Sequence, residues 1–338
     1  MTYRLVSCVW ELTLGCCFSC AHCGSGGGKP RANELTTKEC LNVVGQLKEL
    51  HCERVSLIGG EIFMRPDWER IVQELTDSQI LVNVITNGFC ITEEILRTLK
   101  ELRVESVSVS IDGTEKLHDF YRQKGSYEKA LNALDKLTKA EIPTSVITTL
   151  NGENVKELNA LYEVLSKYPL YAWQLQACSP MGNALGNQMP YRFDFETVIK
   201  FVDRVRKEAP FAVGVADNIG YFTKEEGYIR GNQSGEACFR GCSAGLSTLG
   251  IDSIGNVRGC ESMYDPSFIE GNVRERSLVS IWNDPENFAY NRKFTPECLT
   301  GKCRECRMGE YCGGGCRSYN YFVHGKMYES PFCAGGPK

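Results

Sequence analysis

Cysteines gather at two places in the chain with the spacing of metal ligands. Cys16, Cys20 and Cys23 follow the pattern C-x3-C-x2-C. An iron–sulfur cube held by three protein thiolates keeps one iron free for a small molecule. A denser group lies near the end of the chain and comprises Cys303, Cys306, Cys312, Cys316 and Cys333. Because this second group can hold further, fully ligated centres, the two groups together predict a redox enzyme.

Composition limits the classes of protein that fit. The 338 residues predict about two domains, and a hydrophobic content of 42% allows a substantial core. The net charge of −4 offers no basic surface to nucleic acid, and the chain has no apolar run of about 18 residues that would span a membrane. Residues 1–5 lack the pattern of a secretory signal. We therefore expect no nucleic-acid or membrane partner. We also expect a cytoplasmic protein, because tightly clustered cysteines in a long chain without a signal sequence favour metal sites over disulfides.

Short β-like runs alternate with helical patterns from residue 5 to about residue 215. The pattern predicts strands at 5–12, 55–58, 81–85, 104–111, 144–150 and 171–177. The clearest helical patterns are at 37–50, with Thr36 or Thr37 as cap, and at 126–140 and 154–167. About six β/α units fit this alternation. The fold class is therefore α/β, a partial (β/α)6 TIM-like barrel.

Polar side chains follow several of these strands at the point where each strand ends. Gly59, Gly60 and Glu61 follow the second strand and Asn87 the third. Ser110 and Asp112 follow the fourth, and Gln174, Gln176 and Cys178 close the sixth. Because the carboxyl ends of parallel strands meet at one face of a barrel, these residues should converge beside the first cysteine group. This convergence therefore predicts that the chemistry of the protein takes place at that face.

The pattern changes after residue 215. We predict three regions, which are a barrel at 1–215, a linker or covering segment at 216–237, and a cysteine-rich domain at 238–338. Within the last region, the runs 246–251 and 257–260 flank Gly255 and Asn256 and predict a β-hairpin. Among the cysteines outside the two groups, Cys40 and Cys52 are interpreted as small buried hydrophobic residues.

These motifs together resemble a radical S-adenosylmethionine (SAM) enzyme with a C-terminal SPASM domain. Cys16-x3-Cys20-x2-Cys23 is similar to the cluster motif of that family, and Gly59-Gly60-Glu61 to its methionine-amine motif. Cys242, Gly255 and Cys260 resemble the first half of the SPASM pattern, and the C-terminal cysteine group resembles its second half. Ile62 and Phe63 depart from the proline that usually follows the glutamate. Cys17 also opens a second register, C-x2-C-x2-C, but the family spacing favours Cys16.

The resemblance implies the cofactors and their ligands. A [4Fe–4S] cluster on Cys16, Cys20 and Cys23 would bind the methionine part of SAM and cleave it to a 5′-deoxyadenosyl radical that removes hydrogen from the substrate. Glu61 would accept a hydrogen bond from the methionine ammonium, Ser110 and Arg122 would hold its carboxylate and the ribose, and Asn87 could also serve the ribose. The other residues that the resemblance implies for cofactor binding are Gly59, Gly60, Asp112 and Gln174.

Two auxiliary [4Fe–4S] clusters are implied as well. Cys242, Cys260 and Cys316, with Cys238 as the fourth ligand, would hold the first cluster. The ligands of the second would be Cys303, Cys306, Cys312 and Cys333. Zinc is the alternative, because thiolates suit both metals.

The resemblance further implies oxidative modification of a peptide. The leading hypothesis is a C–C, C–S or similar crosslink in a ribosomally made precursor peptide, with a flavodoxin or ferredoxin as electron donor. A separate leader-binding protein is a possible further partner, because the barrel begins within about ten residues of the start. The alternatives are formylglycine formation in sulfatases, with Glu261 in place of the usual aspartate base, and peptide epimerisation, with Cys178 as hydrogen donor. From a different class, an iron–sulfur electron carrier or a zinc scaffold also stays open.

Overall fold

A single open sheet organises the chain. The computed structural model describes residues 3–230 and 238–335. Its strands are ordered β10-β9-β8-β1-β2-β3-β4-β5-β6-β7, and every neighbouring pair from β8 to β7 is parallel. Their bounds are β1 (Ser7–Glu11), β2 (Arg54–Ile58), β3 (Leu81–Thr86), β4 (Ser106–Ser110), β5 (Thr144–Leu150), β6 (Ala172–Ala177), β7 (Ala212–Val215), β8 (Thr248–Ile251), β9 (Asn256–Arg258) and β10 (Gly271–Asn272).

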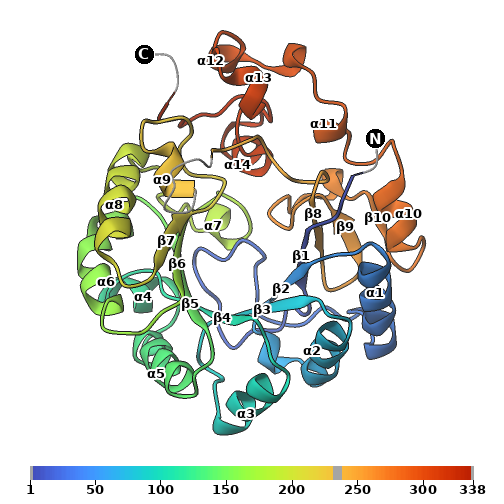
Figure 1. Cartoon of the computed structure of the whole chain (residues 1–338), viewed down its shortest axis with the longest axis vertical. Helices are drawn as coiled ribbons and strands as arrows, with labels where there is room; N and C mark the ends of the chain where they lie inside the picture. The colour runs from blue at the N-terminus through green and yellow to red at the C-terminus, as the bar shows by residue number, and fades with distance from the viewer. Residues whose placement is uncertain (1–2, 231–237, 336–338) are drawn as a thin grey trace.

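Helices α1, α2, α3, α5, α6 and α8 cover the outside of the curved sheet (Figure 1). Figure 1 shows the strands as an arc with helices on its outer side and the loop that follows β1 inside it. The α-helices are α1 (Thr37–Glu49), α2 (Trp68–Asp77), α3 (Glu93–Glu101), α4 (Glu115–Tyr121), α5 (Ser126–Lys139), α6 (Leu158–Leu165), α7 (Asn183–Gly186), α8 (Phe195–Glu208), α9 (Glu226–Arg230), α10 (Leu278–Asn283), α11 (Ala289–Arg292), α12 (Gly301–Arg304), α13 (Gly309–Cys312) and α14 (Arg317–His324). The 3-10 turns of the described residues are η1 (Ile62–Met64), η2 (Asn154–Glu157), η3 (Pro266–Phe268) and η4 (Pro296–Cys298). Within the described ranges, no helix has the length and apolar character that crossing a bilayer requires.

The partial barrel predicted from the sequence is confirmed, with two additions. The six predicted strands are β1 to β6, and they pair in parallel in chain order. The short strand β7 extends the sheet beyond β6, and β8 adds to β1 at the other side. The predicted hairpin is β8–β9, which pairs antiparallel. Because β8 pairs with β1, the sheet continues across the expected boundary at residue 238.

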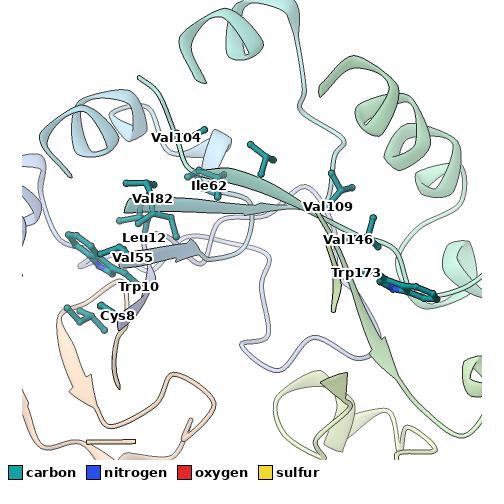
Figure 2. Close-up of a cluster of buried hydrophobic side chains, with 14 of the residues drawn as sticks. Cys8, Trp10, Leu12, Val55, Ile62, Val82, Val104, Val109, Val146 and Trp173 are labelled. Atoms are coloured by element: carbon teal, nitrogen blue, oxygen red, sulfur yellow. The ribbon is translucent and has the colours of Figure 1, made fainter. Parts of the chain in front are cut away.

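Alternation along the strands separates the core from the lumen of the barrel. Side chains point to opposite faces at successive strand positions. Figure 2 shows Trp10, Val55, Val82, Val109 and Val146 among the buried hydrophobic side chains along neighbouring strands. The intervening positions are often small and polar, as in the sequence Ser-Val-Ser-Val-Ser of β4. A closed TIM barrel fills its interior with bulky branched residues, so this lumen is unlike a packed barrel core.

Local sequence explains where helix α1 begins. The Thr36 hydroxyl accepts a hydrogen bond from Glu39 N, and the Glu39 carboxylate accepts one from Thr36 N, which forms a capping box. Cys40, on the buried face of this helix, and Cys52 are both buried, as predicted.

Two glycines let the turn after β2 touch the turn after β1. Gly60 N donates to Thr13 O at 2.7 Å, and Glu61 N donates to Gly15 O at 2.7 Å. A Cβ atom on Gly59 would lie 2.4 Å from Thr13 O, and one on Gly60 would lie 2.1 Å from Gly15 O. Neither backbone oxygen can move aside as a flexible side chain could. The glycines are therefore required by this contact, which places Glu61 next to the first cysteine group.

We predict opposite effects for alanine at two glycines. Gly60→Ala should lower the free energy of unfolding by more than about 2 kcal/mol, because the new methyl group meets fixed backbone. Gly45→Ala, in the exposed interior of α1 with nothing near the added carbon, should raise it by about 0.5–1 kcal/mol. Anaerobic thermal unfolding of both variants checks this. Equal unfolding temperatures for the two would contradict the close-contact argument.

Candidate functional site

The lumen of the barrel is a cavity of about 710 Å³ that reaches the carboxyl ends of the strands. Strands β1 to β6 all contribute to its walls, and so do the loop after β1 and the residues after β9. Its polar and sulfur-bearing lining includes Cys16, Cys20, His22, Cys23, Ser56, Asn83, Asn87, Ser106, Ser108, Ser110, Arg122, Thr149, Gln174, Gln176, Cys260 and Glu261. A polar cavity of this size suits a cofactor together with part of a substrate.

The three cysteines of the first group face this cavity together. Cys16, Cys20 and Cys23 all line it. Phe18 N lies 3.4 Å from Cys16 Sγ and Gly27 N lies 3.3 Å from Cys23 Sγ, so backbone donors already serve two of the sulfurs. Donors of this kind stabilise thiolates and the clusters bound to them.

Cys17, the alternative in the second register, is placed differently. Asn87 Nδ2 lies 3.4 Å from Cys17 Sγ, and Cys17 is not among the residues that line the cavity. The geometry therefore agrees with the register that begins at Cys16.

A segment after β6 holds the cysteine loop in place. Asn183 N donates to Cys23 O at 2.9 Å, and Asn183 Nδ2 donates to Cys20 O at 3.0 Å. Asn187 Nδ2 donates to Ala21 O at 3.0 Å. These asparagines belong to α7 and its C-terminus, far from the loop in sequence, and sequence reasoning did not identify them. Two asparagines in a loop without any other motif do not by themselves indicate a role at a distant loop.

Glu61 is fully buried between the cysteine loop and the end of β3. Its carboxylate accepts hydrogen bonds from Thr86 Oγ1 and Asn87 N, each at 2.9 Å. Burial raises the pKa of Glu61 to about 7, against the lowering effect of these hydrogen bonds. A cation that binds beside Glu61 would therefore stabilise the charged form of its carboxylate.

Asp112 is the centre of a buried polar network rather than part of the cavity wall. Its Oδ2 lies 2.9 Å from His22 Nε2 and 2.6 Å from Arg122 Nε, and its Oδ1 accepts from Thr149 N at 2.8 Å. Burial alone would raise the pKa of Asp112, but the positive charge of Arg122, aided by His22, holds it well below the usual range. Asp112 therefore fixes the orientation of Arg122, whose guanidinium also lines the cavity.

Glu261 reaches the cavity from the opposite side. It is 5% exposed, and neither of its carboxylate oxygens has a hydrogen-bond partner within the described residues. Burial, followed by the charge of Glu11, raises the pKa of Glu261 well above its usual value. A buried carboxyl group without partners is costly, and both oxygens of Glu261 are closed to solvent although the residue lines the cavity.

Cys178, by contrast, does not line the cavity. It packs in a small buried cluster with Tyr121, Ala184 and Met189, and burial raises the pKa of its thiol to about 12. This placement gives no support to Cys178 as a hydrogen donor.

The C-terminal cysteines form two sets. Cys303, Cys306, Cys312 and Cys333, the second auxiliary set, line one small pocket. Burial and then the charges of Cys303, Cys333 and Cys306 raise the pKa of Cys312 to about 11.

The first auxiliary set consists of Cys242, Cys260 and Cys316. Their proximity shows in the pKa of Cys316, which burial raises most and the charges of Cys242 and Cys260 raise further. Cys238 lies at the edge of the described residues, with its Sγ 3.5 Å from Tyr311 Oη. Its assignment as fourth ligand stays a prediction.

The thiol sets fit iron–sulfur clusters better than single metal ions. Among the described residues, no three Cys, His, Asp or Glu side chains are close enough to enclose one ion. A cube of four irons and four sulfides separates its thiolates more widely than one ion does. Three cysteines around an open cavity and four around a closed pocket are the donor sets that such cubes take.

Comparison with protein families matches two parts of the chain. Residues 10–165 match the radical SAM superfamily, and residues 242–307 match SPASM, an iron–sulfur cluster-binding domain.

Two proteins that are similar over most of this chain differ in their activities. An AdoMet-dependent heme synthase of Methanosarcina barkeri is 32% identical over 98% of this chain and 96% of its own length. The mycofactocin maturase MftC of Mycobacterium tuberculosis is 26% identical over 93% of this chain and 78% of its own. Among solved structures, Streptococcus suis SuiB is similar in fold at 15–16% identity. Its SAM complex has a TM-score of 0.79 and covers 98% of this chain and 78% of SuiB, and its complex with the precursor peptide SuiA has a TM-score of 0.78 with 98% and 76% coverage.

We predict that iron content distinguishes Cys16 from Cys17. Cys16→Ala should remove about four iron atoms per chain, because it takes one thiolate from an open cluster. Cys17→Ala should keep the iron of the unaltered chain, because its sulfur lies beside Asn87 and outside the cavity. Iron analysis after anaerobic reconstitution measures both. The reverse result would establish the C-x2-C-x2-C register instead.

Proposed function

Because the chain belongs to the radical SAM superfamily and carries a SPASM iron–sulfur cluster-binding domain, we propose that it is a maturase of a ribosomally made precursor peptide. It is an enzyme whose cofactors are [4Fe–4S] clusters and SAM. We assign the radical SAM domain to residues 1–215, a bridging segment to 216–237 and the SPASM domain to 238–338. The cytoplasm is the proposed location, because none of the 18 cysteines forms a disulfide and a reducing compartment would keep them so.

Cys16, Cys20 and Cys23 are the proposed ligands of the catalytic cluster. When bound, this cluster and SAM supply a 5′-deoxyadenosyl radical that abstracts hydrogen from the substrate. The protein's own contribution is to place the three thiolates at one end of the lumen and to hold their loop by Asn183 and Asp112. A fixed loop limits access of water to the reacting groups.

Two buried charged residues, Glu61 and Arg122, are proposed to bind the methionine part of SAM. Arg122 lines the cavity, and Glu61 directly follows Gly59 and Gly60, which also line it. The Glu61 carboxylate is proposed to accept a hydrogen bond from its ammonium group. Arg122 is proposed to bind its carboxylate, because Asp112 holds Nε while the guanidinium also lines the cavity. Ser110, Asn87 and Gln174 line the same cavity and are assigned to polar groups of the nucleoside.

Two auxiliary clusters are proposed on the C-terminal cysteine sets. Cys238 completes the first set and the second set is complete with four cysteines. These clusters would accept the second electron that an oxidative crosslink releases, and the proton would pass to Glu261. The support for this role is the unpartnered Glu261 carboxyl group, which follows Cys260 directly and lines the cavity.

The similarity of this chain to maturases supports the proposal of a peptide substrate. MftC and SuiB are both similar to most of this chain, and a crystal structure of SuiB contains its precursor peptide SuiA. We propose hydrogen abstraction from one residue of such a peptide, followed by an oxidative C–C, C–S or similar crosslink. A flavodoxin or ferredoxin would supply electrons, and a separate leader-binding protein is a further proposed partner.

A heme precursor is the second candidate substrate, and one observation favours it. The relative with 32% identity, which this chain matches over 96% of its length, is a heme synthase. The polar lumen of about 710 Å³ is also large enough for much of a tetrapyrrole.

We predict a product that separates these candidates. The reduced enzyme, SAM and the peptide encoded beside the gene should give a peptide lighter by two hydrogens per crosslink, measured by mass spectrometry. Glu261→Gln should still cleave SAM to 5′-deoxyadenosine but form at least about tenfold less crosslinked peptide, because it cannot take the proton. An unchanged peptide, together with conversion of an iron porphyrin precursor, would reject the peptide proposal in favour of the second candidate.

We also predict a pH dependence of SAM binding. With a pKa of about 7 in the unoccupied site, Glu61 is neutral at lower pH and gains its full attraction for an ammonium group at higher pH. SAM affinity should therefore fall as the pH is lowered from 8 to 6, by up to about tenfold. Glu61→Gln should bind weakly at both pH values. Isothermal titration calorimetry measures this, and an equal slope in the variant would exclude Glu61 as the cause.

A further inference from the structure

Tyr221 is a buried residue that touches both auxiliary cysteine sets. It lies between β7 and α9 and is 3% exposed. Its hydroxyl accepts a hydrogen bond from Cys316 N at 3.0 Å and donates one to Asp217 O at 2.8 Å. The same residue lines the pocket formed by the second auxiliary set, and Cys333 Sγ lies 3.9 Å from its carbonyl oxygen. One residue thus contacts the backbone of the first set through its hydroxyl while lining the site of the second.

The ring of Tyr221 has little freedom to move. Phe239 packs against it with ring centroids 4.5 Å apart, and the guanidinium carbon of Arg230 lies 5.6 Å from its centroid. Gly315, with φ at +93°, approaches so closely that an added Cβ would be 2.9 Å from Tyr221 Cε2. This packing holds the hydroxyl at the Cys316 amide.

The amide that Tyr221 occupies belongs to a proposed cluster ligand. Hydrogen bonds from N–H groups to cluster or thiolate sulfur stabilise the more negative reduced state, and so raise the reduction potential. The Cys316 N–H is directed instead to a tyrosine oxygen, and this removes one donor from the surroundings of the first set.

We propose that Tyr221 is a positioning residue that keeps the Cys316 N–H away from sulfur and thereby holds the reduction potential of the first auxiliary cluster low. A cluster of low potential stays oxidised in the resting enzyme. Only the oxidised form can take one electron from a substrate radical, and that transfer oxidises the radical and reduces the cluster. The inference rests on the proposed function for the ligand assignment of Cys316.

The test is a redox titration of Tyr221→Phe, followed by electron paramagnetic resonance. The full chain with Cys16→Ala, Cys20→Ala and Cys23→Ala serves as background, so that only the auxiliary clusters contribute to the spectrum. The midpoint potential of one auxiliary cluster should rise in the variant by about 59 mV. For a one-electron couple, this shift is roughly a tenfold increase in the ratio of reduced to oxidised cluster at a fixed potential. The other midpoint should stay in place, because the ring remains.

Tyr328→Phe is the matched control in the same domain. Its hydroxyl donates to Tyr290 O at 3.2 Å and to no cysteine, so both midpoints should be unchanged. Unchanged or lowered midpoints in Tyr221→Phe would overturn the proposal. So would loss of iron in Tyr221→Phe, which would make the hydroxyl a structural element only. Cys316→Ser tests the assignment separately, because auxiliary spectra that it leaves unaltered would remove Cys316 as a ligand and the inference with it.

Discussion

The site depends on the docking of one irregular loop against the ends of the parallel strands. The loop after β1 carries Cys16, Cys20 and Cys23, and it has little secondary structure of its own. Its backbone is instead bonded to the turn after β2, to Tyr121 O at the end of α4, and to Asn183 after β6. An irregular loop can hold three thiolates in one arrangement only if such contacts satisfy its backbone groups. The flexibility that a long loop usually has is removed by elements that lie far apart in sequence.

The docking of the loop after β1 also determines where the buried charged side chains lie. Asp112 at the end of β4 binds His22 of the cysteine loop and Arg122 after α4, so one buried carboxylate links the loop, the strand and a cation. Glu61 is the second buried carboxylate near the loop, and its hydrogen bonds come from the end of β3. Burial makes each charge expensive unless it is paired. Asp112 is paired within the protein, whereas Glu61 is hydrogen-bonded only to neutral donors and is the better candidate to receive an external cation.

The sequence was sufficient for the features that repeat or have fixed spacing. The alternation of strands and helices predicted β1 to β6, and the turn residues Gly255 and Asn256 predicted the β8–β9 hairpin. The resemblance to the SPASM pattern anticipated that Cys303, Cys306, Cys312 and Cys333 would share one pocket. What it could not supply are contacts between distant segments. Asn183 at the cysteine loop, Tyr221 at Cys316 and the pairing of β8 with β1 each join segments about 95 to 240 residues apart, and a single sequence carries no periodic signal for them.

The central claim is that three thiolates leave one iron of the catalytic cluster open to SAM. Its most direct test is the formation of 5′-deoxyadenosine from SAM by the dithionite-reduced, iron-loaded enzyme without any substrate, followed by chromatography. The account predicts steady formation by the unaltered chain and none by the chain with Cys16→Ala, Cys20→Ala and Cys23→Ala, although the latter keeps its auxiliary iron. Equal formation by both, or none by an unaltered chain with its full iron content, would contradict it.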